Sequence, residues 1–334
     1  MIVWGIVGNS HDASIAVFKD GKLIWAALAK DFSKIEHDPH LNPDLVNAAK
    51  EASGWRLQVP DKVVWYEKPF LKTLRQLKAG QGWLASENNI KKYLSKWNIN
   101  APIEYVQHHR AHAAYGFFTS GLTNATIMCL DSIGEFETFT IWTGDSYVPG
   151  AGLKQVYSGK YPHSVGLFYS AMTQRLGLKA NRDEYKVSEM GMDIATHENL
   201  HLINDMIETF IAKPLDGSKP GVKFKVNLHK GCDWYKPDLT TEQDMKRLAN
   251  ATQFVFETIL KSNNDWCMKN LPSRNLILTG GCALNRDAVK KIRKYWNYVY
   301  VPKNPGDPGS CIGSVLALEN RHIDFDEQVW YNNK

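Results

Sequence analysis

The chain has 334 residues, 43% of them hydrophobic and 22% charged, which is ordinary for a globular protein. No apolar run reaches the roughly 18 residues that a membrane helix needs, and the N-terminus lacks the basic segment of a signal peptide, so we expect a cytoplasmic protein without membrane contact. The formal net charge of +5 permits a polyanionic partner but does not require one. The five cysteines are scattered, which indicates reduced thiols rather than disulfides or a zinc site.

The first predicted elements are three strands. The apolar run at 2–7 ends at Gly8-Asn9, and the Asp-Gly pair at 20–21 predicts a hairpin between the apolar stretches 13–18 and 23–28. Residues 126–142 repeat this pattern, with a strand, a loop that contains an aspartate and a glycine, and a second strand. The repeat predicts two related α/β halves that face a central cleft.

Helices are predicted between the strands. Residues 69–97 have a helical, strongly basic pattern, and Thr240 with Gln243 resembles a capping box that opens a helix to about residue 269. The segment 213–238, within an insertion near 197–238, is rich in glycine, proline and lysine. We expect it to be irregular, solvated and in contact with substrate.

Three histidines lie close together in HHRAHAAYG, residues 108–116. On a helix, His108 and His112 would share one face at positions i and i+4, an arrangement that binds metal in known helical motifs. The alternative is a polar helix end with exposed or hydrogen-bonded imidazoles.

Two distant carboxylates could join these histidines. Asp131 ends an apolar strand, and Asp307 lies in the tight loop of NPGDPGSCIGS. Each could instead be a simple turn or capping residue. Two imidazoles and two carboxylates would suit Fe(II), Zn(II) or Mn(II).

An ordered set of motifs then gives a family resemblance. In chain order, the motifs are HDAS, HHRAHAA, DSIGE, PHSVGLFYSAMT, EYKV, GGCALN and PGDPGSCIG. With them the chain resembles, along nearly its whole length, the O-carbamoyltransferases of the antibiotic-tailoring and nodulation-factor type. The resemblance implies an α/β fold of the actin/hexokinase/Hsp70 type, with two ribonuclease-H-like halves (1–120, with the basic helical segment, and 121–334) around a nucleotide cleft. It also implies that His108, His112, Asp131 and Asp307 hold a divalent metal, Fe(II) first.

The same resemblance assigns further residues. Loops 8–14 and 131–134 would face the phosphates of ATP, and GGCALN would approach the adenosine, because glycine lets backbone N–H groups come close to a ligand. Glu184 and Lys186 match a segment near the substrate, or else form an exposed ion pair. The nucleotide-binding residues expected on this basis are Asn9, Ser132, Gly134, Glu184, Lys186, Gly280, Gly281 and Asn285.

The implied reaction moves a carbamoyl group from carbamoyl phosphate, through carbamoyl-adenylate made with ATP, to an acceptor hydroxyl. His11, beside Asp12, is the candidate base for the acceptor proton. Lys34 matches a basic segment of the family, although Glu36 stands where another base is expected. Family members carry a C-terminal adenylate-forming domain that we expect this chain to lack. A separate protein would then supply the adenylate, unless this domain makes it.

Three acceptors remain open. The first is a hydroxymethyl group of 5-hydroxymethylcytosine in DNA, as in viral (phage) genomes that hypermodify cytosine, with support from the basic 69–97 segment and the lysines at 290–294. Such lysines are also typical of solvated helix faces. The second is a small molecule or sugar hydroxyl, and the third is threonylcarbamoyl transfer to tRNA. From another class, the chain could be a non-catalytic nucleotide-binding module.

Overall fold

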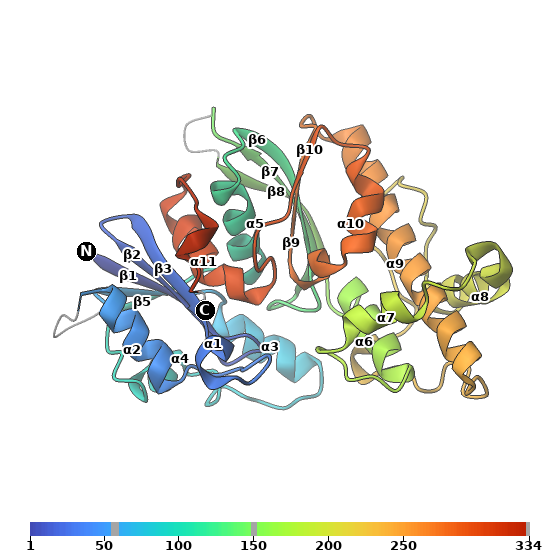
Figure 1. The fold of residues 1–334 in the computed structure, drawn as a ribbon, viewed down its shortest axis with the longest axis horizontal. Coiled ribbons are helices and arrows are strands. Elements are labelled where there is room, and N and C mark those ends of the chain that lie inside the picture. The colour runs from blue at the N-terminus through green and yellow to red at the C-terminus, as the bar shows by residue number, and fades with distance from the viewer. Residues whose placement is uncertain (55–59, 148–151, 332–334) are drawn as a thin grey trace.

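Two five-stranded sheets organise the protein (Figure 1). The computed structural model describes residues 1–54, 60–147 and 152–331. The strands of the first sheet, in spatial order, are β3 (Lys22–Leu28), β2 (Ser14–Lys19), β1 (Ile2–Val7), β4 (Lys62–Trp65) and β5 (Ile103–Tyr105). Those of the second are β10 (Tyr298–Tyr300), β9 (Asn275–Thr279), β6 (Asn124–Leu130), β7 (Glu137–Asp145) and β8 (Leu153–Lys160).

The two sheets have the same topology. In each, the first three strands form an antiparallel meander and the last two join it in parallel, beside the first strand. This duplicated order is that of two ribonuclease-H-like halves, and the expected α/β fold is confirmed. The predicted hairpin is also present, since Asp20 and Gly21 both have positive φ, as a tight two-residue turn requires.

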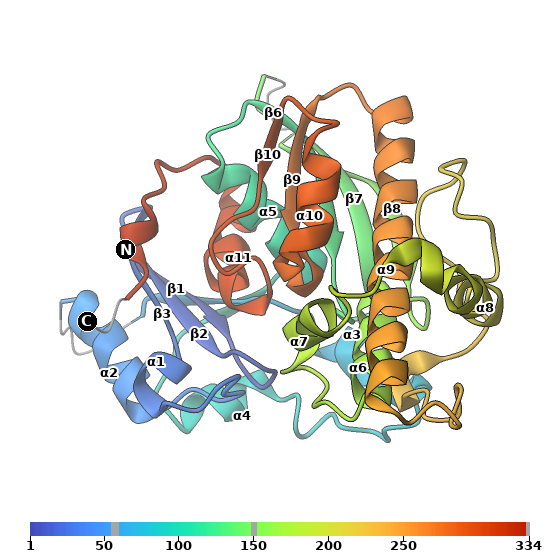
Figure 2. The same cartoon turned by 45° about the vertical axis from the view of Figure 1, so that its right-hand side comes forward.

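Helices cover the sheets, as Figures 1 and 2 show. The first-half helices are α1 (Lys30–Ser33), α2 (Pro43–Ala52), α3 (Pro69–Lys78) and α4 (Ile90–Ser95). The later α-helices are α6 (Val165–Arg175), α7 (Glu184–Met190), α8 (Leu200–Phe210), α9 (Glu242–Asn270) and α10 (Arg286–Arg293). Short 3-10 helices are η1 (Thr196–Asn199), η2 (Leu228–Lys230), η3 (Gly281–Leu284), η4 (Asp307–Gly309) and η5 (Glu327–Val329).

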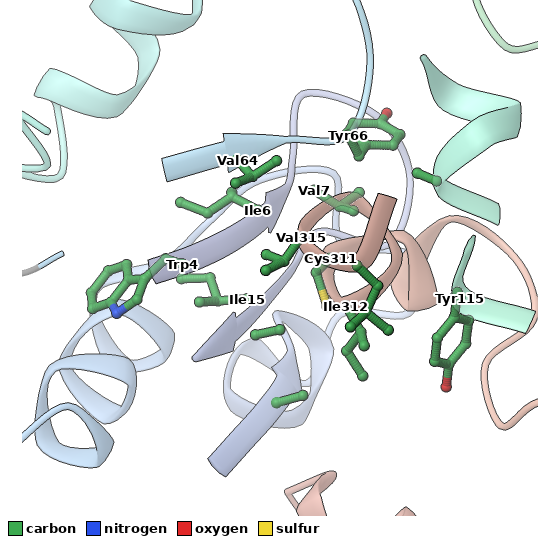
Figure 3. Close-up of a cluster of buried hydrophobic side chains, with 14 of the residues drawn as sticks. Trp4, Ile6, Val7, Ile15, Val64, Tyr66, Tyr115, Cys311, Ile312 and Val315 are labelled. Atoms are coloured by element: carbon green, nitrogen blue, oxygen red, sulfur yellow. The ribbon is translucent and has the colours of Figure 1, made fainter. Parts of the chain in front are cut away.

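Two further helices, α5 (His108–Thr119) and α11 (Ser310–Glu319), lie between the sheets and pack against each other. The strands of the first sheet precede residue 120 and those of the second follow it, yet α5 packs on the second sheet and α11 on the first. Figure 3 shows the apolar side chains of Cys311, Ile312 and Val315 beside the first sheet. The crossed packing ties the two halves together at their centre.

The second sheet is buried on both faces. Along β6, Ile127 and Cys129 contribute to the core around α5 and α11, while Met128 and Leu130 contribute to a second core with α6 and α9. This alternation follows from the two-residue period of a strand. The carboxyl end of β6 is thereby held rigidly at the point where the chain enters the loop with Asp131.

We predict that Gly313→Ala destabilises the protein. A β-carbon at residue 313 would lie 2.0 Å from the main-chain oxygen of Ala111, so α5 and α11 would have to separate. Helix propensity alone favours alanine by about 1 kcal/mol, whereas overpacking costs about 1–3 kcal/mol. Denaturant unfolding should therefore show a net loss, and the control Leu318→Ala, on the exposed side of α11, tests helix propensity without this clash. A Gly313→Ala protein that is more stable than the wild type would contradict the packing argument.

Two helix predictions need correction. The segment 69–97 is not one helix but α3 and α4, separated by a stretch in which Gly80 and Gly82 have positive φ. The capping box of α9 lies one residue later than expected, at Thr241 and Asp244, and the helix ends at Asn270.

The basic face expected on 69–97 is only partly exposed. Lys72 and Arg75 are buried, and Lys72 forms an ion pair with Glu67 at 2.7 Å. The reason is tertiary: α3 packs inward beside the loop after β1, where Lys72 also donates to the main-chain oxygen of Asn9. Because Lys72 and Arg75 are buried, they do not contribute to a basic surface on this segment.

The segment 213–238 is irregular, as expected, but it is not wholly solvated. Phe224, Leu228, Cys232 and Tyr235 are buried in the core of the second half. All five cysteines are free. Among the described residues, no helix combines the length and hydrophobicity that a bilayer crossing needs.

Candidate metal centre and its surroundings

Four buried side chains converge between the two sheets. His108 and His112 come from successive turns of α5, Asp131 directly follows β6, and Asp307 begins η4. One ligand atom from each lies within 4.8 Å of all the others. The candidate ligands from three separated segments are thus brought together.

The spacing of these atoms suits one metal ion. The Nε2 atom of His108 lies 3.0 Å from Oδ2 of Asp131 and 3.2 Å from Oδ1 of Asp307. The Nε2 atom of His112 lies 3.6 Å and 3.5 Å from the same two oxygens. Metal–ligand bonds of about 2.0–2.2 Å place neighbouring ligands roughly 3.0–3.5 Å apart in octahedral or tetrahedral geometry. The four nitrogen–oxygen distances, from 3.0 to 3.6 Å, are close to that spacing.

The hydrogen-bonding state of the cluster also fits a cation. The Nε2 atoms of the two histidines face each other at 2.9 Å, so at most one neutral imidazole can donate in that contact. Oδ1 of Asp307 is buried, and the groups that face it are the same two Nε2 atoms, at 3.2 and 3.5 Å. A buried carboxylate is costly unless a cation meets it. The donor set therefore fits a divalent metal.

The charges of the cluster are mutually dependent. Burial alone would lower the pKa of His108, but Asp307 and Asp131 raise that pKa well above its usual value. Burial alone would raise the pKa of Asp131 and Asp307, but the facing imidazoles hold both well below their usual range. Two ionised carboxylates are therefore retained in the interior, where a divalent cation can balance them.

Polar neighbours orient three of the four side chains, His112, Asp131 and Asp307. Ser310 Oγ lies 3.2 Å from Nδ1 of His112, Ser10 Oγ donates to Asp307 at 3.4 Å, and the Gly281 N–H donates to Asp131 at 3.4 Å. Ligand histidines typically use their second ring nitrogen in this way. The two serines were not predicted from the sequence, because a serine in a glycine-rich loop is also the commonest turn residue.

Glu135 is a further residue that the sequence reasoning missed. Its buried carboxylate accepts the N–H of His108, at the start of α5, and the N–H of Lys68, before α3. Burial raises its pKa. Its place in DSIGE was the available signal, but nothing in that motif showed which helices it would join.

We expect Glu135→Ala to weaken metal binding and stability, because it leaves two backbone N–H groups without an acceptor at a cost of about 1–3 kcal/mol each. Glu135→Gln keeps an acceptor oxygen at the same place and should retain most of both properties. Metal titration of the two variants, alongside their denaturant unfolding, measures the difference. Equal behaviour of Ala and Gln would show that Glu135 does not position α5.

The first loop brings His11 and Asp12 beside the metal cluster. His11 Nε2 lies 3.9 Å from Asp307, and its Nδ1 lies 3.1 Å from Asp12. Asp12 also contacts His37 Nδ1 at 2.9 Å and has a left-handed backbone with φ 61°. Non-glycine residues in this conformation are uncommon and gather at functional sites.

The protonation of His11 bears on its expected role. Partial loss of solvent lowers the pKa of the half-exposed His11, but Asp307 and Asp12 raise it overall to about 9. With the metal ligands unneutralised, His11 is thus a cation at neutral pH and a proton donor rather than a base. The role of His11 as a base stays a prediction. It requires a bound cation at Asp307 that lowers the pKa of His11.

Lys34 is not brought to the cluster. Its side chain is exposed and its ammonium donates to the main-chain oxygen of Asp31 at 2.6 Å. Asn9 lies in the first loop with φ 58°, and its side-chain amide donates to the main-chain oxygen of Glu87. Within the described ranges, neither side chain has a contact with the metal cluster.

The 131–134 loop packs closely on its neighbours. A β-carbon at Gly134 would lie 3.1 Å from His108 and His109, and one at Gly166 would lie 2.8 Å from Ser132. Ser164, which caps α6, donates to the main-chain oxygen of Asp131. The N-terminus of α6 therefore lies directly at Ser132.

The GGCALN segment follows the turn after β9. Gly280 has φ 84°, and a β-carbon there would lie 2.1 Å from the main-chain oxygen of Leu130, so only glycine fits. A β-carbon at Gly281 would lie 3.3 Å from Asp131. Asn285 caps α10 and exchanges hydrogen bonds with Gln253, which also accepts from Tyr169. Gln253 was not predicted, since it lies mid-helix on α9.

Glu184 and Lys186 do not pair with each other. Ser170 and the N–H of Asn181 donate to Glu184, while Lys186 pairs with Asp183 at 2.9 Å. Burial, with the charges of Asp131 and Glu184, raises the pKa of Cys282. Lys186 is exposed in an ordinary surface ion pair, worth little by itself.

The fold and the cluster together define an α/β protein of two ribonuclease-H-like halves with a buried His₂Asp₂ donor set between its sheets. The family model described as carbamoyltransferase N-terminus matches residues 3–316, so the chain belongs to the carbamoyltransferase family.

Individual relatives are distant. The protein sll1178 of Synechocystis sp. is 25% identical over 98% of this chain and 58% of its own length. The nodulation protein NolNO of Sinorhizobium fredii is 23% identical over 93% of this chain and 46% of its own length. Full-length HypF, in a phosphate- and nucleotide-bound form, aligns with 99% of this chain and 56% of its own at 12% identity, with a TM-score of 0.49. The chain thus spans about half the length of the curated relatives it matches.

Proposed function

We propose that the protein is a metal-dependent O-carbamoyltransferase that uses ATP and carbamoyl phosphate, through carbamoyl-adenylate, to carbamoylate a hydroxyl group. The observation that carries this proposal is the convergence of His108, His112, Asp131 and Asp307 in a chain of the carbamoyltransferase family. Of the metals that suit two imidazoles and two carboxylates, Fe(II) is the first choice, with Zn(II) and Mn(II) as alternatives.

The metal would supply a positive charge that stabilises oxygen anions of the donor during transfer. The protein's own residues would do the rest. Asp12 holds His11 through its Nδ1 and turns its Nε2 toward Asp307, where the acceptor proton can be moved. The second imidazole, His37, also contacts Asp12 and fixes the carboxylate in place. His11 is 45% exposed, so an acceptor can reach it from solvent.

Nucleotide binding would use the opposite side of the 131–134 loop. The N-terminus of α6 lies at Ser132, where the helix dipole favours phosphate. The Gly280–Gly281 turn packs on Leu130 and Asp131, and beside it the bonded amides of Asn285 and Gln253 form a polar surface for a base. Glu184, beside this region, could accept from a ribose hydroxyl.

The proposed acceptor is the hydroxymethyl group of 5-hydroxymethylcytosine in DNA. Its support is the net charge of +5 and the exposed lysines at 290, 291 and 294, of which Lys291 pairs with Glu257. Carbamoylation of a small-molecule or sugar hydroxyl is the competing outcome. Delivery of carbamoyl-adenylate by a separate protein is the competing arrangement for the donor, and the cytoplasm is the proposed location.

The test is mass spectrometry of nucleosides after incubation of the protein with hydroxymethylcytosine DNA, carbamoyl phosphate, ATP and Fe(II). A second arm supplies carbamoyl-adenylate directly. We expect one carbamoyl unit on hydroxymethylcytosine, absent with Asp131→Ala. If only free sugars or small-molecule alcohols are carbamoylated, the acceptor is a small molecule and not hydroxymethylcytosine in DNA. If no hydroxyl is carbamoylated in either arm, the proposed reaction is wrong.

A further inference from the structure

A groove lies beside the outer strand of the second sheet. Two adjoining hollows, of about 280 and 500 Å³, share Tyr157, Val222 and Lys223 in their walls, so they form one continuous surface feature. Four lysines line it. We call it the lysine groove, and its cationic residues are Lys160, Lys213, Lys219 and Lys223.

The charge of the lysine groove is strongly one-sided. All four lysines are exposed, and none has an ion-pair partner within the part of the chain that the structure describes. The lining segments, 157–163 and 213–223, contain one carboxylate, Asp216. Glu137, on the adjacent strand, accepts hydrogen bonds from Ser158 and Gln155. Burial and the charge of Lys223 lower the pKa of His163, which also lines the groove.

The lysine groove is built on a fixed frame. The N–H of Gly221 donates to Asn263 at 2.6 Å and that of Gly217 donates to Ser262 at 3.1 Å, so α9 holds the loop at two points. A bridge between Ile211 and Phe224 closes its base. Unpaired ammonium groups on an anchored loop repel one another, and an anionic ligand would relieve that repulsion.

The lysine groove lies at the same end of the sheet as the metal cluster. Lys160 ends β8, Asp131 follows the end of β6, and β7 lies between these two strands. Neighbouring strands are about 4.8 Å apart, so the two positions are separated by roughly 10 Å across the sheet. His163 lines the groove, and the next residue, Ser164, donates to the main-chain oxygen of Asp131.

We propose that the lysine groove binds the phosphodiester backbone of a nucleic-acid strand and leads it to the metal cluster, an inference that rests on the proposed function for its acceptor. Four cations spread over two adjoining hollows match a polymer of several phosphates better than one phosphate. The strand, rather than the nucleotide that the protein uses as a cofactor, is the occupant.

The test measures binding of a fluorescent single-stranded oligonucleotide with unmodified cytosines, over a range of salt concentrations. The variant is Lys219→Ala with Lys223→Ala. The matched control is Lys19→Ala with Lys22→Ala, which removes the same charge from the exposed β2–β3 hairpin. We expect the groove variant alone to bind more weakly and to lower the salt slope by between about 1 and 2. Equal slopes in the two double variants, or no binding by the wild type, would overturn the inference.

A second arm compares transfer to hydroxymethylcytosine in DNA and in the free nucleotide. The groove variant should lose transfer to DNA and keep transfer to the nucleotide, and equal losses on both would overturn the polymer assignment. Because the binding probe has no acceptor hydroxymethyl group, the two proposals fail separately. Groove-dependent binding without any carbamoyl transfer refutes the proposed function alone, and transfer to the nucleotide without strand binding refutes the groove alone.

Discussion

The His108→Ala variant is expected to lose carbamoyl transfer by roughly 10³-fold or more, because a metal that stabilises developing charge contributes several kcal/mol to the transition state. The reason lies in the position of this imidazole. It lies within 3.2 Å of both candidate carboxylate ligands, and His112 lies 2.9 Å from it. Removing it leaves two buried carboxylates facing one imidazole. Initial rates of transfer at saturating donor measure the loss.

The control for this variant is His197→Ala, which removes a histidine whose side chain is 81% exposed. It should leave the rate and the metal content unchanged. Folding of His108→Ala is checked by circular dichroism, so that a lost rate is not a lost fold. A folded His108→Ala protein with the wild-type rate would remove the metal cluster from the mechanism.

Metal removal should have the second large effect, and it is seen without any substrate. An ion that binds only the folded state stabilises it by about 2.7 kcal/mol when its concentration is one hundred times the Kd. We therefore expect chelator-treated protein to unfold at lower denaturant, and Fe(II), Mn(II) or Zn(II) to restore its stability. Denaturant unfolding followed by tryptophan fluorescence measures this increment.

The increment must depend on the cluster itself. Asp307→Asn keeps the shape of the side chain but removes the negative charge, so added metal should stabilise this variant much less than the wild type. His197→Ala again serves as the matched comparison. An equal metal-dependent increment in Asp307→Asn would place the bound ion somewhere else.

The core of the candidate site could be predicted because its signals are local. The i, i+4 spacing of His108 and His112 fixes their shared face once the segment is a helix. The position of Asp131 at the end of an apolar strand is likewise visible in the sequence, and the repeated strand–loop–strand pattern anticipated the two similar sheets. Asp307 was a candidate from its tight loop, and the resemblance to a family then implied that it completes this set.

Tertiary packing decided what could not be predicted. Lys72 and Arg75 look like surface cations, but α3 turns them inward, and Lys72 is neutralised by Glu67. The role of Glu135 becomes visible only in the folded structure, where the N–H groups at the starts of α3 and α5 both donate to its carboxylate. A sequence lists charges along a chain, whereas these roles depend on which segments approach one another.

The lysines near the cluster illustrate the same distinction. Lys34, expected to take part from the resemblance, lies exposed and bonded to its own turn. Lys219 and Lys223, within a segment noted for its composition alone, lie in an anchored groove at the metal-bearing end of the sheet. Whether a lysine can bind a ligand depends on the position in which the surrounding structure holds it.

The most direct test of the central claim is the number of metal ions bound per chain, measured by anaerobic titration with Fe(II) and by elemental analysis of the washed protein. The account predicts one ion per wild-type chain and none in the folded His108→Ala protein. Binding of no ion by the wild type, or of one ion by both proteins, would contradict the assignment of His108, His112, Asp131 and Asp307 as a metal centre.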